Sequence, residues 1–345
     1  MPNYYDGTKL LSMRDLNGDI PEIYICTSNR TAGKTTYFNR KVHNGWKKYG
    51  KKYMLIYRFN YELDDVVDKF YKDIQNLFFQ DEEFTAKKIG RGIAVELYSN
   101  GNNCGYAVSL NNADSIKKYS HLFSDTACMV FDEFQSETNH YCDNELKKFQ
   151  SIHTSVSRGN GEQVRYVPVY MISNPVTIIN PYYVSLGISS RLQENTHFLK
   201  GNGFVLEQGF NESACEAQKS SGFNKAFAQD DYQLYASQGI YLNDNKAFIE
   251  KPEGIGKYLC TIKVDRRSYA IREFAESGVI YCDDKPDMSF PIKLAVTLND
   301  HDVNYVMLKR NELFISNLRW YFDKGCFRFK DLSSKDALMK TISYI

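Results

Sequence analysis

Nine consecutive residues near the N-terminus carry the clearest chemical pattern in this sequence. They follow the apolar residues 23–26 and Thr27, and they read, in order, Ser28, Asn29, Arg30, Thr31, Ala32, Gly33, Lys34, Thr35 and Thr36. The P-loop pattern G-x-x-x-x-G-K-[ST] is met at every defined position except the first, where Ser28 replaces glycine. In a P-loop, backbone N–H groups and the positive end of the next helix hold phosphate oxygens. The segment therefore predicts a binding site for ATP and Mg²⁺.

Individual residues of this segment have specific tasks in phosphate binding. Lys34 is expected to reach the β- and γ-phosphates, and the Thr35 hydroxyl is expected to ligate Mg²⁺. Gly33 would let the backbone approach the phosphates more closely than a residue with a Cβ could. Because serine is small, Ser28 need not disrupt the turn. Taken alone, the segment could equally be a strand, a turn and a helix with a solvated lysine.

A second pattern combines the apolar residues 127–131 with two carboxylates, Asp132 and Glu133. We expect this strand beside the P-loop strand. Asp132 would hold Mg²⁺ directly or through water, and Glu133 would polarise the attacking water as the general base. Acids at both positions favour hydrolysis over slow switching. Alone, this could be an ordinary buried strand with a solvated acidic end, but its order and spacing after the P-loop favour an ATPase.

Further side chains could meet the phosphates. Arg158 lies in a glycine-rich turn and could reach the γ-phosphate of a neighbouring subunit as an arginine finger, or be an ordinary surface arginine. Arg30, inside the P-loop, could act on its own nucleotide or brace the loop. Asn174 follows another apolar run. It could contact the γ-phosphate or the attacking water as a sensor, or form a turn before Pro175.

Alternating strands and helices in the first 200 residues must position these side chains. The apolar patterns predict strands at residues 23–27, 53–58, 127–131 and 166–173, and a hairpin at 95–98 and 106–110. Helical patterns occur at residues 34–49, 61–77 and 145–156. Strands that alternate with helices indicate an α/β domain with a mainly parallel sheet.

The remainder of the chain has a different pattern. Residues 201–238 are polar and contain several glycines, which indicates a linker or a small connecting subdomain. Strand patterns at 247–249, 258–264, 268–272 and 279–281 then precede helical patterns at 301–322 and 334–343. Strands followed by helices predict a smaller α+β domain. We therefore expect three parts, at residues 1–200, 201–238 and 239–345.

Composition narrows the class of protein. The chain has 345 residues, 43% of them hydrophobic, and a net charge of +1, so it can bury a core and has no general attraction for nucleic acid. Its eight cysteines include no C-x-x-C pair, which favours reduced thiols in an intracellular protein. His140 and Cys142 are not followed by a second ligand pair, so we expect no metal site there. Since no apolar run approaches about 18 residues, we expect a soluble protein without a membrane partner.

Motifs within residues 24–183 together resemble the DNA-encapsidation ATPases of small tailed phages, the phi-29-like packaging motors. The P-loop with its internal Arg30 is the first. The others are, in chain order, Tyr57-Arg58 with Glu62-Leu63, Val130-Phe131-Asp132-Glu133-Phe134, Val156-Ser157-Arg158, Ile172-Ser173-Asn174-Pro175-Val176 and Asn180-Pro181-Tyr182. The P-loop and the acidic strand occur in many ATPases, whereas the Phe-Asp-Glu-Phe motif combined with the last two is more specific.

The resemblance implies an ATP-driven motor subunit that moves double-stranded viral DNA into a preformed procapsid in the host cytoplasm. The ATPase domain would be of the type with an additional strand and a catalytic glutamate. The C-terminal domain would resemble the RNase H-like nuclease of large terminases in a degenerate form, without its catalytic acids. The subunits would form a ring, typically a pentamer, on the procapsid portal, and some family members dock through a packaging RNA.

Residue by residue, the resemblance implies that Lys34, Glu133 and Arg158 are catalytic, with Glu133 as the base and Arg158 acting in trans. Residues 28–36 and Asn174 would contact the nucleotide, and Thr35 and Asp132 would hold Mg²⁺. The family has glycine where this chain has Ser28. This difference bears on the geometry of the P-loop and not on its presence. Two other functions stay open: a cellular ring translocase for DNA, and an assembly protein that switches with nucleotide and has no motor activity.

The C-terminal part matches the family only loosely. Asp265, Asp283 and Asp284 end strand patterns and could begin a nuclease metal cluster, but acids at strand ends are more often turn residues, so we expect no nuclease. From His301 onward, eight basic and five acidic side chains are interleaved with aromatic residues. This segment could meet nucleic-acid phosphates, or it could be a packed helix with an ordinary solvated face.

Overall fold

The fold is described here from a computed structural model, for residues 4–137, 140–142, 144–158, 163–178, 180–189, 191–192, 196–226, 248–308, 312–324 and 326–343. The chain divides into two compact units, each with its own hydrophobic core. Unit 1 contains Met1–Pro175 and Asn195–Ile240, and unit 2 contains Val176–Glu194 and Tyr241–Ile345. Unit 2 therefore includes a short segment from the middle of the chain.

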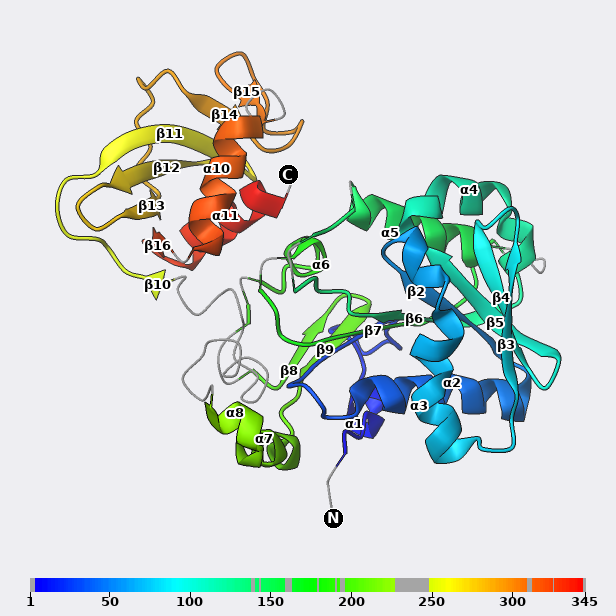
Figure 1. Ribbon diagram of the computed structural model, residues 1–345. Coiled ribbons are helices and arrows are strands. Elements are labelled where there is room, and N and C mark those ends of the chain that lie inside the picture. Colours follow the sequence, from blue (N-terminus) through cyan, green and yellow to red (C-terminus); the bar gives the residue numbers. More distant parts are fainter. Residues whose placement is uncertain are drawn as a thin grey trace. The chain divides into compact units, whose positions relative to one another are not determined.

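Unit 1 is built on a nine-stranded sheet (Figure 1). Six adjacent strands are parallel, and in sheet order they are β5 (Asn102–Ser109), β2 (Lys52–Tyr57), β6 (Thr126–Asp132), β7 (Val169–Ser173), β1 (Ile23–Thr27) and β9 (Phe204–Gln208). Antiparallel strands flank them: β4 (Ala94–Ser99) and β3 (Phe84–Ile89) beyond β5, and β8 (Phe198–Gly201) beyond β9. The predicted α/β architecture with a mainly parallel sheet is confirmed.

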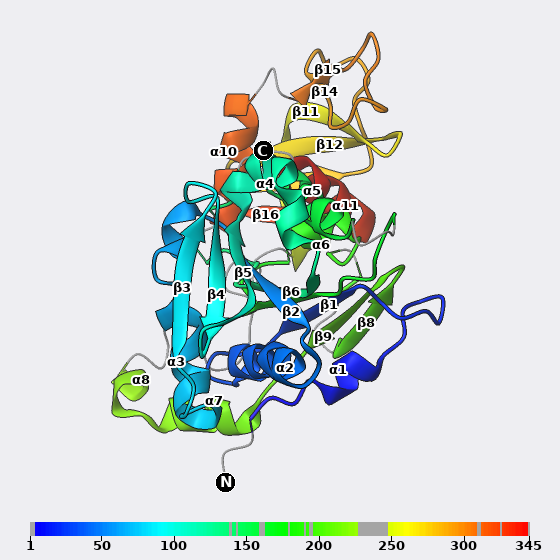
Figure 2. The ribbon, with the colours of Figure 1, turned by 90° about the vertical axis from the view of Figure 1, so that its right-hand side faces the viewer.

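Helices cover both faces of this sheet. α2 (Lys34–Tyr49) and α3 (Val66–Phe78) lie on one face, and α4 (Ala113–Lys118) and α5 (Glu145–Val156) lie on the other (Figure 2). Phe38 and Val42, one helical turn apart on α2, are buried in the core of the first face. On the other face, Phe149 of α5 stacks on Phe131 of β6. The short helices α1 (Thr8–Ser12), α7 (Glu212–Ser220) and α8 (Gly222–Ala226) also belong to unit 1.

The position of the acidic strand corrects one expectation. β6 does not lie beside the P-loop strand β1, because β7 lies between them and pairs in parallel with both. Sequence order could not show this, since β7 comes after β6 in the chain but before it in the path across the sheet from β1.

The hairpin of β8 and β9 corrects a second expectation, because it continues into residues that composition indicated as a linker. β9 pairs in parallel with β1, and Phe204, Val205 and Leu206 are buried. Gly203, which made the stretch resemble a linker, has a φ of +75° in the turn between the two strands. Residues 201–208 are therefore part of the sheet, and residues 227–238 of the expected linker lie outside the described residues.

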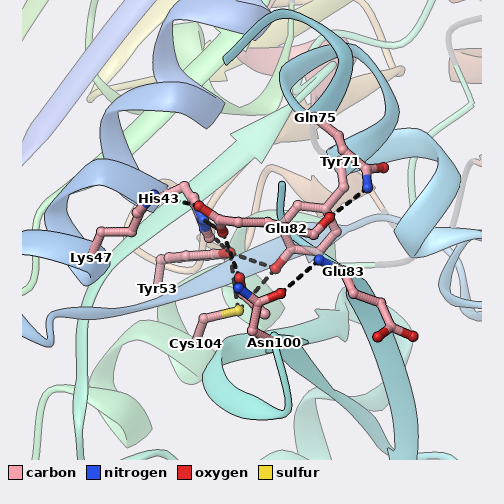
Figure 3. A network of polar contacts seen from close by, with 10 residues as sticks. His43, Lys47, Tyr53, Tyr71, Gln75, Glu82, Glu83, Asn100 and Cys104 are labelled. Atoms are coloured by element: carbon pink, nitrogen blue, oxygen red, sulfur yellow. Dashed lines mark hydrogen bonds and ion pairs between the residues drawn. The ribbon is translucent and has the colours of Figure 1, made fainter. Parts of the chain in front are cut away.

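A buried polar network attaches α2 to the antiparallel edge of the sheet (Figure 3). His43 of α2 hydrogen-bonds to Tyr53 of β2 and to Glu82, which precedes β3. Glu82 also accepts hydrogen bonds from Lys47 and Ser99. Burial lowers the pKa of His43, which favours its neutral form. Because α2 directly follows the P-loop, this network fixes the helix that would point its N-terminus at a phosphate.

Unit 2 contains a seven-stranded mixed sheet. In sheet order its strands are β10 (Phe248–Ile249), β16 (Phe327–Phe329), β13 (Val279–Asp283), β12 (Arg267–Phe274), β11 (Lys257–Val264), β14 (Lys293–Ala295) and β15 (Val306–Met307). β11, β12 and β13 form an antiparallel meander, and the other neighbours pair in parallel. Its described residues include the helices α6 (Pro181–Ser185), α10 (Glu312–Asp323) and α11 (Leu332–Ser343), and α6 contacts α11.

The helix expected at residues 301–322 begins only at Glu312. Of the residues before it, 302–305 form a turn and Val306–Met307 form the short strand β15. The turn is stabilised because the Asp302 carboxylate accepts a hydrogen bond from the backbone N–H of Asn304 and pairs with Lys263. All eight cysteines are free thiols. Among the described residues, no helix combines the length and the apolar character needed to cross a membrane.

Candidate nucleotide site

The predicted P-loop forms the turn between β1 and α2, and the first three residues of α2 are Lys34, Thr35 and Thr36. Gly33 has a φ of +90°, a conformation that only glycine adopts without strain, and a Cβ there would lie 3.2 Å from the ring of Tyr4. Ser28 is buried, but its φ is not positive. The turn therefore requires glycine at position 33 and does not require it at position 28.

Most other side chains of the loop are bonded to protein. The Asn29 amide exchanges two hydrogen bonds with the backbone of Asn211, which caps α7. The Thr31 hydroxyl donates to the carbonyl of Arg30, and Ala32 is buried. These residues can offer backbone N–H groups to a phosphate, while their side chains hold the loop in place.

The side chains of Lys34 and Asn174 are in contact beside this loop. The buried Lys34 Nζ donates to Asn174 Oδ1 over 2.7 Å and to the carbonyl of Ser28 over 3.2 Å. Burial lowers the pKa of Lys34, and the neighbouring Asp132 carboxylate opposes that shift. Asn174 directly follows β7, so the predicted sensor and the predicted phosphate-binding lysine are in contact.

The two predicted Mg²⁺ ligands are also neighbours. Asp132 ends β6, and a hydrogen bond with Thr35 of α2 stabilises its charged form. Burial first, and then the charge of Glu133, raise the pKa of Asp132 to about 6. A hydroxyl and a carboxylate at the N-terminus of a helix fit the way Mg²⁺ is held beside a triphosphate, and the cation would return Asp132 to its charged form.

Glu133 has an exposed side chain on a constrained backbone. Its φ of +54° lies in the left-handed region, which is costly for a residue with a Cβ. Its N–H donates to Asp132 Oδ1 over 2.9 Å. Arg58, just beyond β2, donates to the carbonyl of Glu133 over 3.2 Å and to that of Phe134 over 2.7 Å. This arrangement suits a base that must be aimed at a water molecule.

Arg58 is itself held by a buried ion pair that sequence reasoning did not find. Its Nε lies 2.9 Å from Glu145 Oε2 and its Nη2 3.1 Å from Glu145 Oε1, and the two side chains are 8% and 1% exposed. Glu145 also accepts the backbone N–H of Cys142 over 2.8 Å. The ion pair thus connects β2, the residue pair Glu133 and Phe134, and the first turn of α5. The sequence analysis used Arg58 only within the family motif Tyr57-Arg58, which does not indicate a partner for its side chain.

Arg30 contacts a second residue that sequence reasoning missed. Its Nη2 forms an ion pair with Glu137 Oε1, and the amide of Asn174 donates to the same oxygen over 3.4 Å. Arg30 therefore lies within its own subunit's site, where both of its predicted roles would place it. Lys34, Asn174, Glu137 and Arg30 form a continuous chain of polar contacts.

Comparison with known proteins identifies the family of this chain. A family model described as Podovirus DNA encapsidation protein (Gp16) matches residues 2–342. The chain belongs to this family. The resemblance inferred from the motifs is thereby confirmed for nearly the whole chain.

Individual members of the Gp16 family, and solved structures related to it, are similar over almost their full lengths. The DNA packaging protein of Bacillus phage phi29 is 24% identical over 331 residues, which cover 94% of this chain and 93% of that protein. Among solved structures, a chain of the bacteriophage Phi-29 viral genome packaging motor assembly matches with a TM-score of 0.58 and 22% identity, covering 97% of both chains. A chain of the Phi-28 gp11 DNA packaging motor matches with a TM-score of 0.66 and 15% identity, covering 100% of this chain and 98% of that one. At these identities the structures show that the fold is shared.

Of the residues predicted from the sequence of this Gp16-family chain, Arg158 is the one that lies apart. α5 begins near the carboxyl ends of the parallel strands and runs back for 12 residues, about 18 Å. Arg158 follows its C-terminus, is exposed, and donates to the carbonyl of Thr154 over 3.1 Å. Nearby, Arg165 donates to the carbonyl of Thr126, the first residue of β6. Arg158 is therefore at the edge of the sheet opposite its own P-loop.

The acids at strand ends in unit 2 each pair with a basic side chain. Asp265 accepts a hydrogen bond from Lys340, Asp283 from Arg272 and Asp284 from Lys330. Within the part of the chain that the structure describes, no three His, Cys, Asp or Glu side chains gather as a metal site would require.

Proposed function

We propose that this chain is the ATP-driven subunit of a motor that translocates double-stranded viral DNA into a preformed procapsid. The observation that carries the proposal is the meeting of Lys34, Asn174 and the acidic end of β6 at one edge of the parallel sheet, in a member of the DNA encapsidation family. Ligands of open α/β sheets bind at the carboxyl ends of the strands, where these residues lie.

The residues of the chain suit ATP hydrolysis. Lys34 would neutralise charge on the β- and γ-phosphates, and Thr35 and Asp132 would hold Mg²⁺. Glu133 would take the proton of the attacking water, while Arg58 keeps its backbone in place. When bound, MgATP supplies the phosphoryl group whose transfer to water releases the free energy for DNA movement. This would be an ATPase of the additional-strand type, and the insertion of β7 between β1 and β6 supports that assignment.

We also propose that the subunits form a ring, typically a pentamer, on the procapsid portal in the host cytoplasm, with a packaging RNA as a further docking partner. Arg158 would complete the site of the neighbouring subunit. Its exposed position, at the edge of the sheet away from its own P-loop, supports action in trans. Ring assembly would therefore be required for full turnover.

Unit 2 would be the vestigial nuclease domain. β11, β12 and β13 form an antiparallel meander, and β11 also pairs in parallel with β14. This strand arrangement is compatible with an RNase H-like sheet. The basic partners of Asp265, Asp283 and Asp284 support the loss of metal-dependent cleavage. The middle segment Val176–Glu194 would be part of this domain, with unit 1 as the ATPase domain.

The test is DNA-stimulated ATPase activity of the full chain, with and without procapsids, compared with that of Glu133→Gln. The amide keeps the size of the side chain but cannot accept a proton. We expect Glu133→Gln to bind ATP with the parental affinity and to lose DNA-stimulated hydrolysis and DNA packaging. Hydrolysis at the parental rate would overturn the assignment of the base. ATP binding without any hydrolysis in the parent chain would instead identify a switching assembly protein.

A further inference from the structure

Glu137 contacts the same donors that the terminal phosphate of ATP would require. Its Oε1 is the acceptor of both the Arg30 guanidinium and the Asn174 amide, and Asn174 in turn accepts the hydrogen bond of Lys34. Arg30 belongs to the P-loop and Asn174 to the end of β7, so the carboxylate bridges two elements that face a bound nucleotide. This inference rests on the nucleotide site proposed above.

A triphosphate and the Glu137 carboxylate would compete for these donors. Both are anions, and an arginine guanidinium and an amide N–H are typical partners of phosphate oxygens as well as of carboxylates. Lys34, held by Asn174 and the backbone of Ser28, would have to turn toward the β- and γ-phosphates. The contacts of Glu137 therefore oppose the binding of any ligand that engages Arg30 and Asn174.

A diphosphate would compete less. It lacks the terminal phosphate, which is the group that Asn174 and Arg30 would contact. Glu137 is 33% exposed, so its carboxylate can leave Arg30 for water without a large desolvation penalty. An exposed acid that is easily displaced suits a residue that adjusts affinity rather than one that holds the fold together.

We propose that Glu137 is a specificity-determining residue that competes with the γ-phosphate for Arg30 and Asn174, and so lowers the affinity for ATP relative to ADP. In a ring motor, the competition by Glu137 would keep each subunit from binding ATP too tightly. The subunits could then bind and hydrolyse ATP one after another. Two ligands that compete for one set of donors are coupled by the free energy of that competition, and removal of one raises the affinity of the other.

The experiment compares Mg²⁺-dependent binding of AMP-PNP, a triphosphate that is not hydrolysed, with binding of ADP by calorimetry. The variant is Glu137→Gln in the full chain, which keeps the shape of the side chain and removes its charge. The matched control is Glu22→Gln. Glu22 is 35% exposed and pairs with His153 next to the start of β1, away from the P-loop. A second variant, Glu137→Asp, retains the carboxylate.

We expect Glu137→Gln to bind AMP-PNP at least about 5-fold more tightly while ADP affinity changes by less than about 2-fold. Glu22→Gln should alter neither affinity, and Glu137→Asp should have an affinity ratio closer to the parent than to Glu137→Gln. An equal increase for both nucleotides, or no increase for AMP-PNP, would overturn the role of Glu137 alone. If the parent chain bound neither nucleotide, the nucleotide site would be refuted and this inference with it.

Discussion

Replacing Arg58 by methionine tests whether the buried Arg58–Glu145 ion pair positions Glu133, the proposed catalytic base. The substitution keeps an unbranched side chain but leaves Glu145, only 1% exposed, without its cation. Breaking a buried ion pair by removing one partner costs about 3–5 kcal/mol. The carbonyls of Glu133 and Phe134 also lose their donors, so we expect the upper part of that range. For a unit of this size, each kcal/mol lowers the unfolding midpoint by about 2–4 °C, so a loss of about 4–5 kcal/mol gives about 8–20 °C in total.

Thermal unfolding of the full chain measures the loss of stability, and steady-state ATP hydrolysis measures the effect on Glu133. The control is Lys88→Met, which breaks the pair of Lys88 with Asp64, where the side chains are 61% and 58% exposed. Such a surface pair contributes about 0–1 kcal/mol, so its midpoint should hardly change. Because Arg58 bonds to the backbone beside the base, Arg58→Met should lower kcat far more than it raises KM for ATP.

Two results would refute this reasoning. If Arg58→Met shifted the midpoint no more than Lys88→Met does, the pair would not contribute as a buried ion pair must. If kcat were retained in folded Arg58→Met, the contact to the backbone of Glu133 would have no role in aiming the base. Arg58→Lys provides an intermediate, because lysine keeps the charge but cannot pair with Glu145 in the same two-point geometry.

Further predictions concern the cation, the turn and the subunit interface. The pKa of Asp132 is raised to about 6, so a proton competes with Mg²⁺ for this carboxylate as the pH falls toward that value. The Mg²⁺ concentration that gives half-maximal ATP hydrolysis should therefore rise as the pH is lowered from about 7.5 to about 5.5. Gly33→Ala should abolish ATP binding measured by calorimetry, whereas Ser28→Gly should leave it nearly unchanged, because φ is positive at position 33 and not at position 28. Mixtures of Arg158→Ala and Glu133→Gln subunits should recover part of the ATPase activity that each lacks alone; no recovery at any ratio would exclude action of Arg158 in trans.

The sequence was sufficient to place together those site residues whose positions follow from local spacing. A lysine and a threonine after a glycine turn, and two acids after an apolar run, each describe the end of a strand. In a parallel sheet the carboxyl ends of strands meet at one edge. Lys34, Asp132 and Asn174 could therefore be placed together from their spacing alone, and their contacts agree with that placement.

The residues that were missed depend on contacts between distant parts of the chain. Arg58 and Glu145 are 87 positions apart, and Arg30 and Glu137 are 107 apart. An isolated arginine or glutamate has no periodicity that would indicate such a partner. The hairpin of β8 and β9 was missed for a different reason. Its glycines serve the turn, and its buried residues Phe204, Val205 and Leu206 form a run too short to stand out from polar neighbours.

The order of the strands explains how four distant segments could form the proposed site with separable tasks. β2, β6, β7 and β1 are consecutive in the sheet, and they are followed by Arg58, by the acids of β6, by Asn174 and by the P-loop. Asn174 lies on the P-loop side and bonds to Lys34, whereas Arg58 lies on the far side of β6 and bonds to the backbone of Glu133. In the proposed site, phosphate binding would therefore depend on one neighbour of the acidic strand and the aiming of the base on the other. A substitution that displaces β7 should therefore alter nucleotide affinity first, whereas a substitution that displaces β2 should alter the rate of turnover first.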